Sequence, residues 1–186
     1  MERNVFSAGR RPPMLTLMLL RHAKAESHGA TDDFERALTE RGEDEAARLG
    51  RYLKRTGYSP THAIVSSAKR TTQTFEIVSS NIGGNVPARF ERDLYNATGS
   101  ELCEVVAGAE TTQTLMIVGH NPGILEVALS LAQEGDLSDL DRLRSRFPPC
   151  ALAVLTFSGD DWRDAKCGGR LEMLVLPDDL ERRDNA

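Results

Sequence analysis

The sequence predicts one α/β domain, a three-layer sandwich in which helices flank a mostly parallel central sheet. Short apolar runs alternate with segments of helical spacing, which is typical of strand–helix–strand units. The chain has 186 residues, enough for one domain with a sizeable core. We expect residues 1–13 to be a disordered leader, residues 14–178 to be the folded domain and residues 179–186 to be a polar C-terminal tail.

The first half of the chain supplies two strand–helix pairs. Met14–Leu20 is almost continuously apolar, as expected for a strand that is buried on both faces. Apolar residues recur at intervals of three and four over Thr39–Arg55, which predicts a helix, and Gly57 follows as a stop. The next expected elements are a strand over Thr61–Val65 and a helix over Ala68–Ser80 that Ser67 caps.

The second half continues the alternation and ends in two β segments. The expected elements are a short strand over Val86–Phe90, a helix from Thr98 to about Ala107, a strand over Thr114–Val118 and a helix that Asn121 caps and that reaches about Gln133. Glu134–Arg146 is polar, so we expect it to be irregular or weakly helical. Ala151–Phe157 and Arg170–Leu176 flank a turn rich in Gly and Asp, which predicts a hairpin at the sheet edge.

Composition excludes several classes of protein. The net charge of −5 disfavours a general nucleic-acid surface, and the apolar runs are too short to cross a bilayer. The three cysteines, Cys103, Cys150 and Cys167, are scattered, so they indicate neither a disulfide framework nor a zinc ribbon. We therefore expect a cytoplasmic protein. The leader lacks the apolar core of a secretory signal, and a transit peptide is the alternative to disorder there.

Histidine and arginine residues follow three of the predicted strands. Arg21 and His22 end the first strand, Arg70 opens the helix behind the second, and His120 follows the strand over Thr114–Val118. Ligands of open α/β sheets bind beyond the carboxyl ends of the strands. One guanidinium group can bind two phosphoryl oxygens through parallel hydrogen bonds, and a neutral imidazole is nucleophilic near pH 7. The pattern therefore predicts a phosphoryl-transfer site, and leaves open which histidine attacks.

These motifs resemble the histidine phosphatases, also called the phosphoglycerate mutase-like superfamily. Arg21-His22, Arg70 in Ser-Ser-x-x-Arg-Thr-x-Gln-Thr and His120 in Gly-His-Asn-Pro match its signatures. The resemblance implies the phosphoglycerate mutase-like fold, with His22 as the nucleophile. It also implies that Arg21, Arg70 and His120 bind the phosphoryl group, His120 through hydrogen bonding and positive charge. No metal and no cofactor are implied.

Two further segments, Asp33–Gly42 and Leu94–Ala97, resemble more specifically the small phosphohistidine phosphatases of the SixA type. Many members of the superfamily place a glutamate proton donor after the third strand. Here the region Glu91–Ala97 has no clear match, and Glu91 or Asp93 is the available substitute. An alkoxide needs a proton to leave, whereas imidazole needs less help, so the missing acid favours P–N over P–O cleavage.

The resemblance implies a phosphatase that acts on phosphohistidine in a protein partner, such as a histidine-containing phosphotransfer protein. Neither nucleic acid nor a membrane is an expected partner. One alternative is a small-molecule phosphomonoesterase of the same superfamily. Another is a non-catalytic module that binds phosphoproteins, although a pure binder would not need the nucleophile His22.

Overall fold

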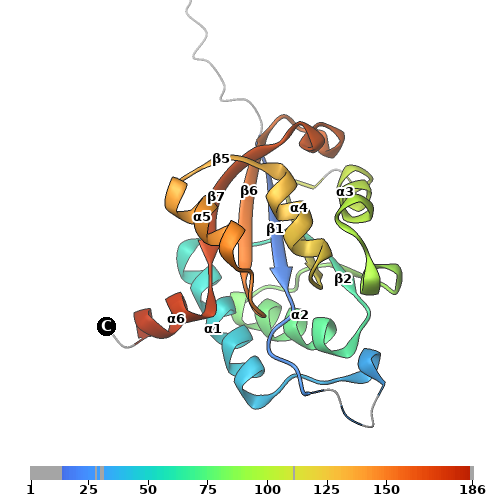
Figure 1. Ribbon diagram of the computed structural model, residues 1–186, viewed down its shortest axis with the longest axis vertical. Coiled ribbons are helices and arrows are strands. Elements are labelled where there is room, and N and C mark those ends of the chain that lie inside the picture. Colours follow the sequence, from blue (N-terminus) through green and yellow to red (C-terminus); the bar gives the residue numbers. More distant parts are fainter. Residues whose placement is uncertain (1–13, 28, 30–31, 111, 185–186) are drawn as a thin grey trace, which may run out of the picture.

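The protein folds into three layers, with a seven-stranded sheet between two layers of helices, as the computed structural model shows (Figure 1). The structure describes residues 14–27, 29, 32–110 and 112–184, so the expected leader over residues 1–13 lies outside the described part. The strands are β1 (Met14–Arg21), β2 (His62–Ser66), β3 (Ala88–Glu91), β4 (Thr114–Gly119), β5 (Ala132–Gly135), β6 (Leu152–Ser158) and β7 (Gly169–Val175), in the order β3-β2-β4-β1-β6-β7-β5. Strand β6 runs antiparallel to β1 and β7, and the other pairings are parallel. The predicted fold class is confirmed.

Helices cover both faces of the sheet because its strands are apolar on both sides. One face carries α1 (Glu40–Thr56), α2 (Lys69–Ile82) and α6 (Pro177–Asp184), and the other carries α3 (Gly99–Ala107), α4 (Gly123–Leu131) and α5 (Leu137–Ser145). Three 3-10 helices connect these elements: η1 (Asp33–Glu35), η2 (Asp93–Asn96) and η3 (Trp162–Cys167). Within β1, Leu17 and Leu19 enter one core while Met18 and Leu20 enter the other.

The order of the strands positions the site. Strand β4 lies between β1 and β2 and is parallel to both, and Arg21 pairs in register with Gly119. The carboxyl ends of these three strands therefore meet at one edge, toward which β1 points in Figure 1. The expected convergence of the residues that follow β1, β2 and β4 rests on this arrangement.

The region after α4 differs from the prediction. Helix α4 ends at Leu131, short of Gln133, because the next four residues form β5 and pair with β7. The polar stretch expected to be irregular contains the regular helix α5, whose Leu140 and Leu143 are buried. Strands β6 and β7 are antiparallel neighbours as predicted, but they do not form the sheet edge, because β5 lies outside β7.

Two predicted caps and the predicted tail are also corrected. Helix α2 begins after Ala68 without a side-chain cap, so Ser67 is not its cap. Helix α4 begins after Pro122, and the Asn121 amide instead donates to the Phe147 carbonyl oxygen at 3.1 Å. The segment expected to be a tail is helical in α6 as far as Asp184. Within the described ranges, no helix is long and apolar enough to cross a membrane.

Candidate active site

His22 lies directly beyond β1 with one ring nitrogen fixed. Its Nδ1 lies 2.8 Å from the carbonyl oxygen of Ala23, and a carbonyl only accepts, so Nδ1 carries the hydrogen. Burial lowers the pKa of His22 to about 4, with the nearby Arg70 and Arg21 charges acting in the same direction. The ring is therefore neutral at pH 7, and its lone pair is on Nε2. This is the tautomer that a nucleophilic imidazole requires.

His120 follows β4, and its ring lies 5.2 Å from that of His22, measured between centroids. Its Nε2 is 2.9 Å from the buried hydroxyl of Ser66, at the end of β2. When that hydroxyl donates, the proton of the neutral ring is on Nδ1. Ser66 thereby orients His120 as a hydrogen-bond donor, a role for Ser66 that no sequence motif indicates.

The charge state of His120 differs from the expectation. Burial lowers its pKa to about 3, and the neighbouring His22, Arg70 and Arg21 also lower it. His120 is therefore neutral at pH 7 in this structure, and it offers an N–H group rather than a full positive charge. The negative charge of a bound phosphoryl group would raise this pKa.

Arg21 ends β1 and is half-buried. Its Nη1 donates to the carbonyl oxygen of Phe147 at 2.8 Å, the same oxygen that accepts from Asn121. The backbone of the adjacent Cys150 donates to the carbonyl oxygen of His22 at 2.9 Å. The loop between α5 and β6 thus holds both the Arg21 guanidinium and the backbone of His22. No sequence pattern pointed to this loop.

Arg70 lies in the first turn of α2 and is buried. Its Nη1 donates to the backbone oxygen of Asp33 at 2.6 Å, and its Nη2 donates to the Asp33 carboxylate at 3.0 Å. Asp33 thus binds the end of the guanidinium and leaves the Nε edge open. Arg70 is not a surface ion pair, because the side chain is buried between α2 and η1.

The polar atoms that lack a partner fall in the predicted site. Among the described residues, the buried side-chain nitrogen and oxygen atoms without a hydrogen bond are Arg21 Nε, Arg70 Nε, His120 Nδ1 and Asn121 Oδ1. Buried polar groups are normally hydrogen-bonded, so these atoms indicate a ligand. Three of them can donate, and two belong to cations, which indicates that the ligand is an anion.

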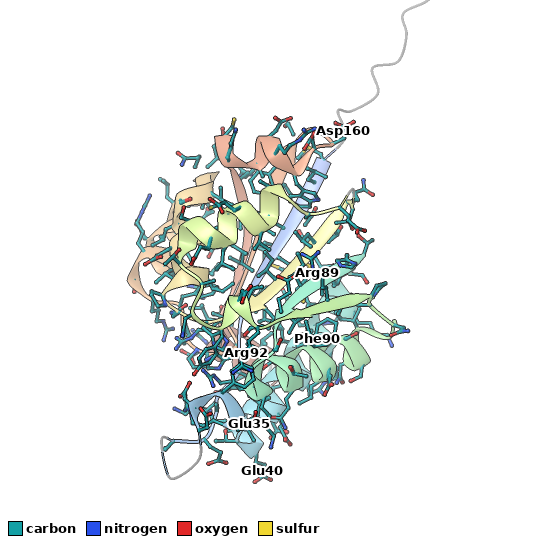
Figure 2. The ribbon with its side chains drawn as sticks, turned by 90° about the vertical axis from the view of Figure 1, so that its right-hand side faces the viewer. Glu35, Glu40, Arg89, Phe90, Arg92 and Asp160 are labelled. Atoms are coloured by element: carbon teal, nitrogen blue, oxygen red, sulfur yellow. The ribbon has the colours of Figure 1, made fainter. Side chains whose placement is uncertain are left out.

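The two SixA-like segments meet beside this site. The Tyr95 hydroxyl from η2 donates to the Asp33 carboxylate of η1 in a short hydrogen bond. The rings of Phe34 and Tyr95 lie 5.1 Å apart, and the guanidinium of Arg92 lies 4.7 Å from the Phe34 ring centroid. Figure 2 shows Arg92 and Glu35 in the lower half of the view, with Asp160 at the top. Both segments carry the resemblance to the SixA type, but no local pattern in them indicates a role for Asp33 or Tyr95.

Of the two carboxylates predicted as substitute proton donors, one is ion-paired and the other is exposed. Glu91 at the end of β3 forms an ion pair with Arg89, and Asp93 is exposed at the start of η2. The carboxylate that contacts Arg70 is Asp33. The Tyr95 hydroxyl, with Arg70 and Arg36, holds the pKa of Asp33 well below its usual range. Asp33 is therefore an anion at neutral pH and a poor acid.

The remaining polar residues of the Arg70 motif hold the adjacent loops. Thr74 accepts from the Ala23 backbone at 3.0 Å, and Gln73 accepts from the Leu38 backbone at 2.8 Å. The motif thereby fixes the chain just after His22 as well as containing Arg70. In the described part of the chain, no group of three or more His, Cys, Asp or Glu residues could hold a metal ion.

The low pKa values give a first prediction. At pH 5.5 a free histidine, with a pKa of about 6.5, is mostly charged. We expect His22 and His120 to stay neutral there, because burial disfavours the charged rings and their pKa values are about 4 and about 3. An NMR titration of the ring signals, assigned with His22→Ala and His120→Ala, measures this. Midpoints near pH 6.5 for both rings would contradict it.

Comparison with known proteins agrees with this geometry. Residues 17–98 match the family model of the histidine phosphatase superfamily, branch 1. An uncharacterized protein of Mycobacterium tuberculosis is 31% identical over 152 residues, which is 80% of this chain and 93% of the relative. The chain belongs to the histidine phosphatase superfamily.

Among solved structures, the chain is similar to two candidate phosphohistidine phosphatases of the SixA type. The protein from Nakamurella multipartitia has a TM-score of 0.74 at 30% identity, with 88% of this chain and 96% of that one covered. The protein from Agrobacterium tumefaciens has a TM-score of 0.73 at 30% identity, with 88% and 99% covered. Within its superfamily, the chain therefore resembles SixA.

Proposed function

We propose that the protein is a phosphatase that removes the phosphoryl group from phosphohistidine on a partner protein, through a covalent intermediate on His22. The observation that carries this proposal is the neutral His22 ring beside three unpaired N–H donors. Its Nδ1 is bound to Ala23, so Nε2 is the nucleophile, while Arg21, Arg70 and His120 face the same site. These groups can bind the phosphoryl oxygens as charge shifts in the transition state.

The reaction has two steps. In the first, the substrate ring carries a proton on its other nitrogen. The lone pair of His22 Nε2 forms a bond to phosphorus as the P–N bond to that ring breaks, the electron pair of that bond returns to the leaving nitrogen, and the ring leaves as neutral imidazole. In the second, water attacks phosphorus, the bond to His22 breaks, and phosphate leaves with a proton returned to the solvent. Splitting hydrolysis in this way replaces one difficult step with two easier ones.

The choice of phosphohistidine rests on the acid groups around the site. Asp33 is an anion, and its hydrogen bond raises the pKa of Tyr95, so neither donates a proton readily at pH 7. An alkoxide leaving group needs a strong donor, whereas imidazole, whose conjugate acid has a pKa of about 6.5, leaves as a neutral ring once solvent has protonated the substrate. The described residues therefore suit P–N cleavage better than cleavage of an alkyl phosphate.

A substrate panel tests the proposal. We expect kcat/KM to fall in the order phosphohistidine protein, aryl phosphate, and then phosphoserine peptide or sugar phosphate, because a phenol with a pKa of about 10 leaves more easily than an alkanol. A sugar phosphate or phosphoserine peptide turned over fastest would support the small-molecule phosphomonoesterase or another esterase instead. Tight binding of the phosphoprotein without any turnover would support the non-catalytic module.

Removal of metal ions gives a further prediction. We expect activity to survive exhaustive dialysis against EDTA, because two arginines already supply the positive charge that phosphoryl transfer needs. Activity on an aryl phosphate before and after chelation measures this. Loss of activity that Mg²⁺ or Zn²⁺ restores would overturn the proposed mechanism.

A further inference from the structure

A small cavity adjoins the candidate active site on the side of η2. Its volume is about 130 Å³, and its walls include Tyr95, His120, Asn121 and Glu126. A water occupies about 30 Å³ in the liquid, so the cavity has room for about four water-sized groups. His120 borders it, whereas neither Arg21 nor Arg70 does. The cavity therefore lies next to the phosphate-binding groups without containing them, and it fits the part of a substrate that carries no phosphoryl charge.

The walls of the cavity suit a flat ring. Tyr95 stands edge-on to His120, with ring centroids 5.4 Å apart and an interplanar angle of 80°. Tyr95 is fixed in place, because its hydroxyl is bound to Asp33 and its ring packs on Phe34. Because these two rings contact each other, an aromatic ligand in the cavity packs beside the pair and not between its rings. A five-membered imidazole ring is of the size that this space accepts.

Hydrogen-bond acceptors complete the cavity. The Oε2 atom of Glu126 accepts from the backbone of Gly99 at 2.9 Å, and no hydrogen bond of its Oε1 atom is found among the described residues. Asn121 also lines the cavity, and its buried Oδ1 atom has no partner among the described residues. We infer that this cavity binds the departing imidazole ring of phosphohistidine, with the Glu126 carboxylate accepting a hydrogen bond from the ring nitrogen distal to phosphorus. This inference rests on the proposed function.

The inferred contact removes the need for an acid. A phosphohistidine ring protonated at its distal nitrogen is an imidazolium, and the Glu126 carboxylate stabilises that charge. When His22 attacks and the P–N bond breaks, the electron pair returns to the ring and neutralises it. The ring leaves as neutral imidazole and keeps its distal proton. No proton has to be delivered to the leaving atom.

Other charged groups near the cavity determine how strongly Glu126 acts. Glu101 of α3 is held by Thr98, another lining residue, and this bond lowers the pKa of Glu101. Besides Glu126, the titratable groups on the walls are Tyr95 and His120, and Asp33, Arg21 and Arg70 lie beyond them. The amino ends of α3 and α4 carry partial positive charge, which disfavours a cationic ring. The carboxylates of Glu101 and Glu126 are therefore the groups that favour such a ring.

The variant Glu126→Gln tests the inference with small substrates. Glutamine retains an oxygen for the Gly99 backbone but replaces the charged, ring-facing acceptor with an NH2 donor. At pH 8 the ring of the free substrate is rarely protonated. There we expect kcat/KM for phosphoimidazole to fall by about tenfold or more. At pH 6, where a ring with a pKa of about 6.5 is largely protonated already, the loss should shrink to roughly two- or threefold. An aryl phosphate has no distal N–H, so its kcat/KM should change less than about twofold.

Single-turnover kinetics and a matched variant complete the design. Only phosphorylation of His22 should slow in Glu126→Gln, because the ring has left before water attacks the phosphoenzyme. Glu104→Gln removes the same charge from an exposed position of α3 outside the cavity, and it should match wild type. Equal losses on both substrates, no loss on phosphoimidazole, or a loss that does not depend on pH would overturn the inference. If wild type hydrolyses the aryl phosphate but neither phosphoimidazole nor phosphohistidine, the proposed function itself fails.

Discussion

Replacing His22 with alanine should abolish the phosphoenzyme and lower kcat by roughly 10⁴- to 10⁶-fold, the range seen when an enzyme loses its nucleophile. The expectation rests on the position of the ring. Its Nδ1 is bound to the Ala23 carbonyl, and burial keeps the ring neutral, so Nε2 can attack at any pH well above 4. Rapid quench with labelled substrate should trap an acid-labile, base-stable phosphoenzyme in wild type and none in His22→Ala.

His62→Ala is the matched control for this experiment. His62 begins β2, at the end of the sheet remote from Ser66 and the site, so label and kcat should stay near wild type. Inorganic phosphate should still bind His22→Ala, because Arg21 and Arg70 remain. Label that persists in His22→Ala would assign the covalent step to another residue, and His120 would be the next to test.

The convergence of His22, His120, Arg21 and Arg70 could be predicted from sequence because it depends on strands. Each follows or opens an element next to an apolar run, and parallel strands bring such positions to one edge. The surrounding contacts could not be predicted in the same way. Asp33 reaches Arg70 across 37 residues through a loop whose path no local pattern specifies.

The secondary structure likewise contains elements that a local pattern predicts and elements that depend on distant contacts. Helix α1 ends at Thr56, and Gly57 caps it in a left-handed conformation with φ of 79°, as its position after the apolar stripe indicated. Strand β5 was missed because its four residues are held by pairing with β7, which a local pattern does not contain. Helix α5 was not predicted as a regular helix even though its local pattern contains helical signals. Its Asp136 cap and its leucines at intervals of three were visible, but the high polarity outweighed them.

The second large effect is expected at Arg70. Its end is bound by Asp33, and its buried Nε has no partner among the described residues, so one edge of the guanidinium is free to bind the phosphoryl group. Arg70→Ala should remove a charge-assisted contact of about 1.5–3 kcal/mol. That corresponds to a loss of roughly 10- to 200-fold in kcat/KM, with weaker inhibition by orthovanadate. Kinetics on an aryl phosphate, with circular dichroism to check folding, measure the effect.

Two further variants separate binding from folding. Arg36 also pairs with Asp33, at 2.7 Å, but it has no unpaired buried atom, so Arg36→Ala should disturb Asp33 and leave orthovanadate inhibition within about threefold of wild type. Arg70→Lys keeps the charge but has a single nitrogen, which cannot bind Asp33 and phosphate along two edges at once. Arg70→Lys should therefore remain at least about fivefold impaired. Near-wild-type kinetics in Arg70→Ala would show that Arg70 only anchors η1, and the phosphoryl group would then depend on Arg21 and His120.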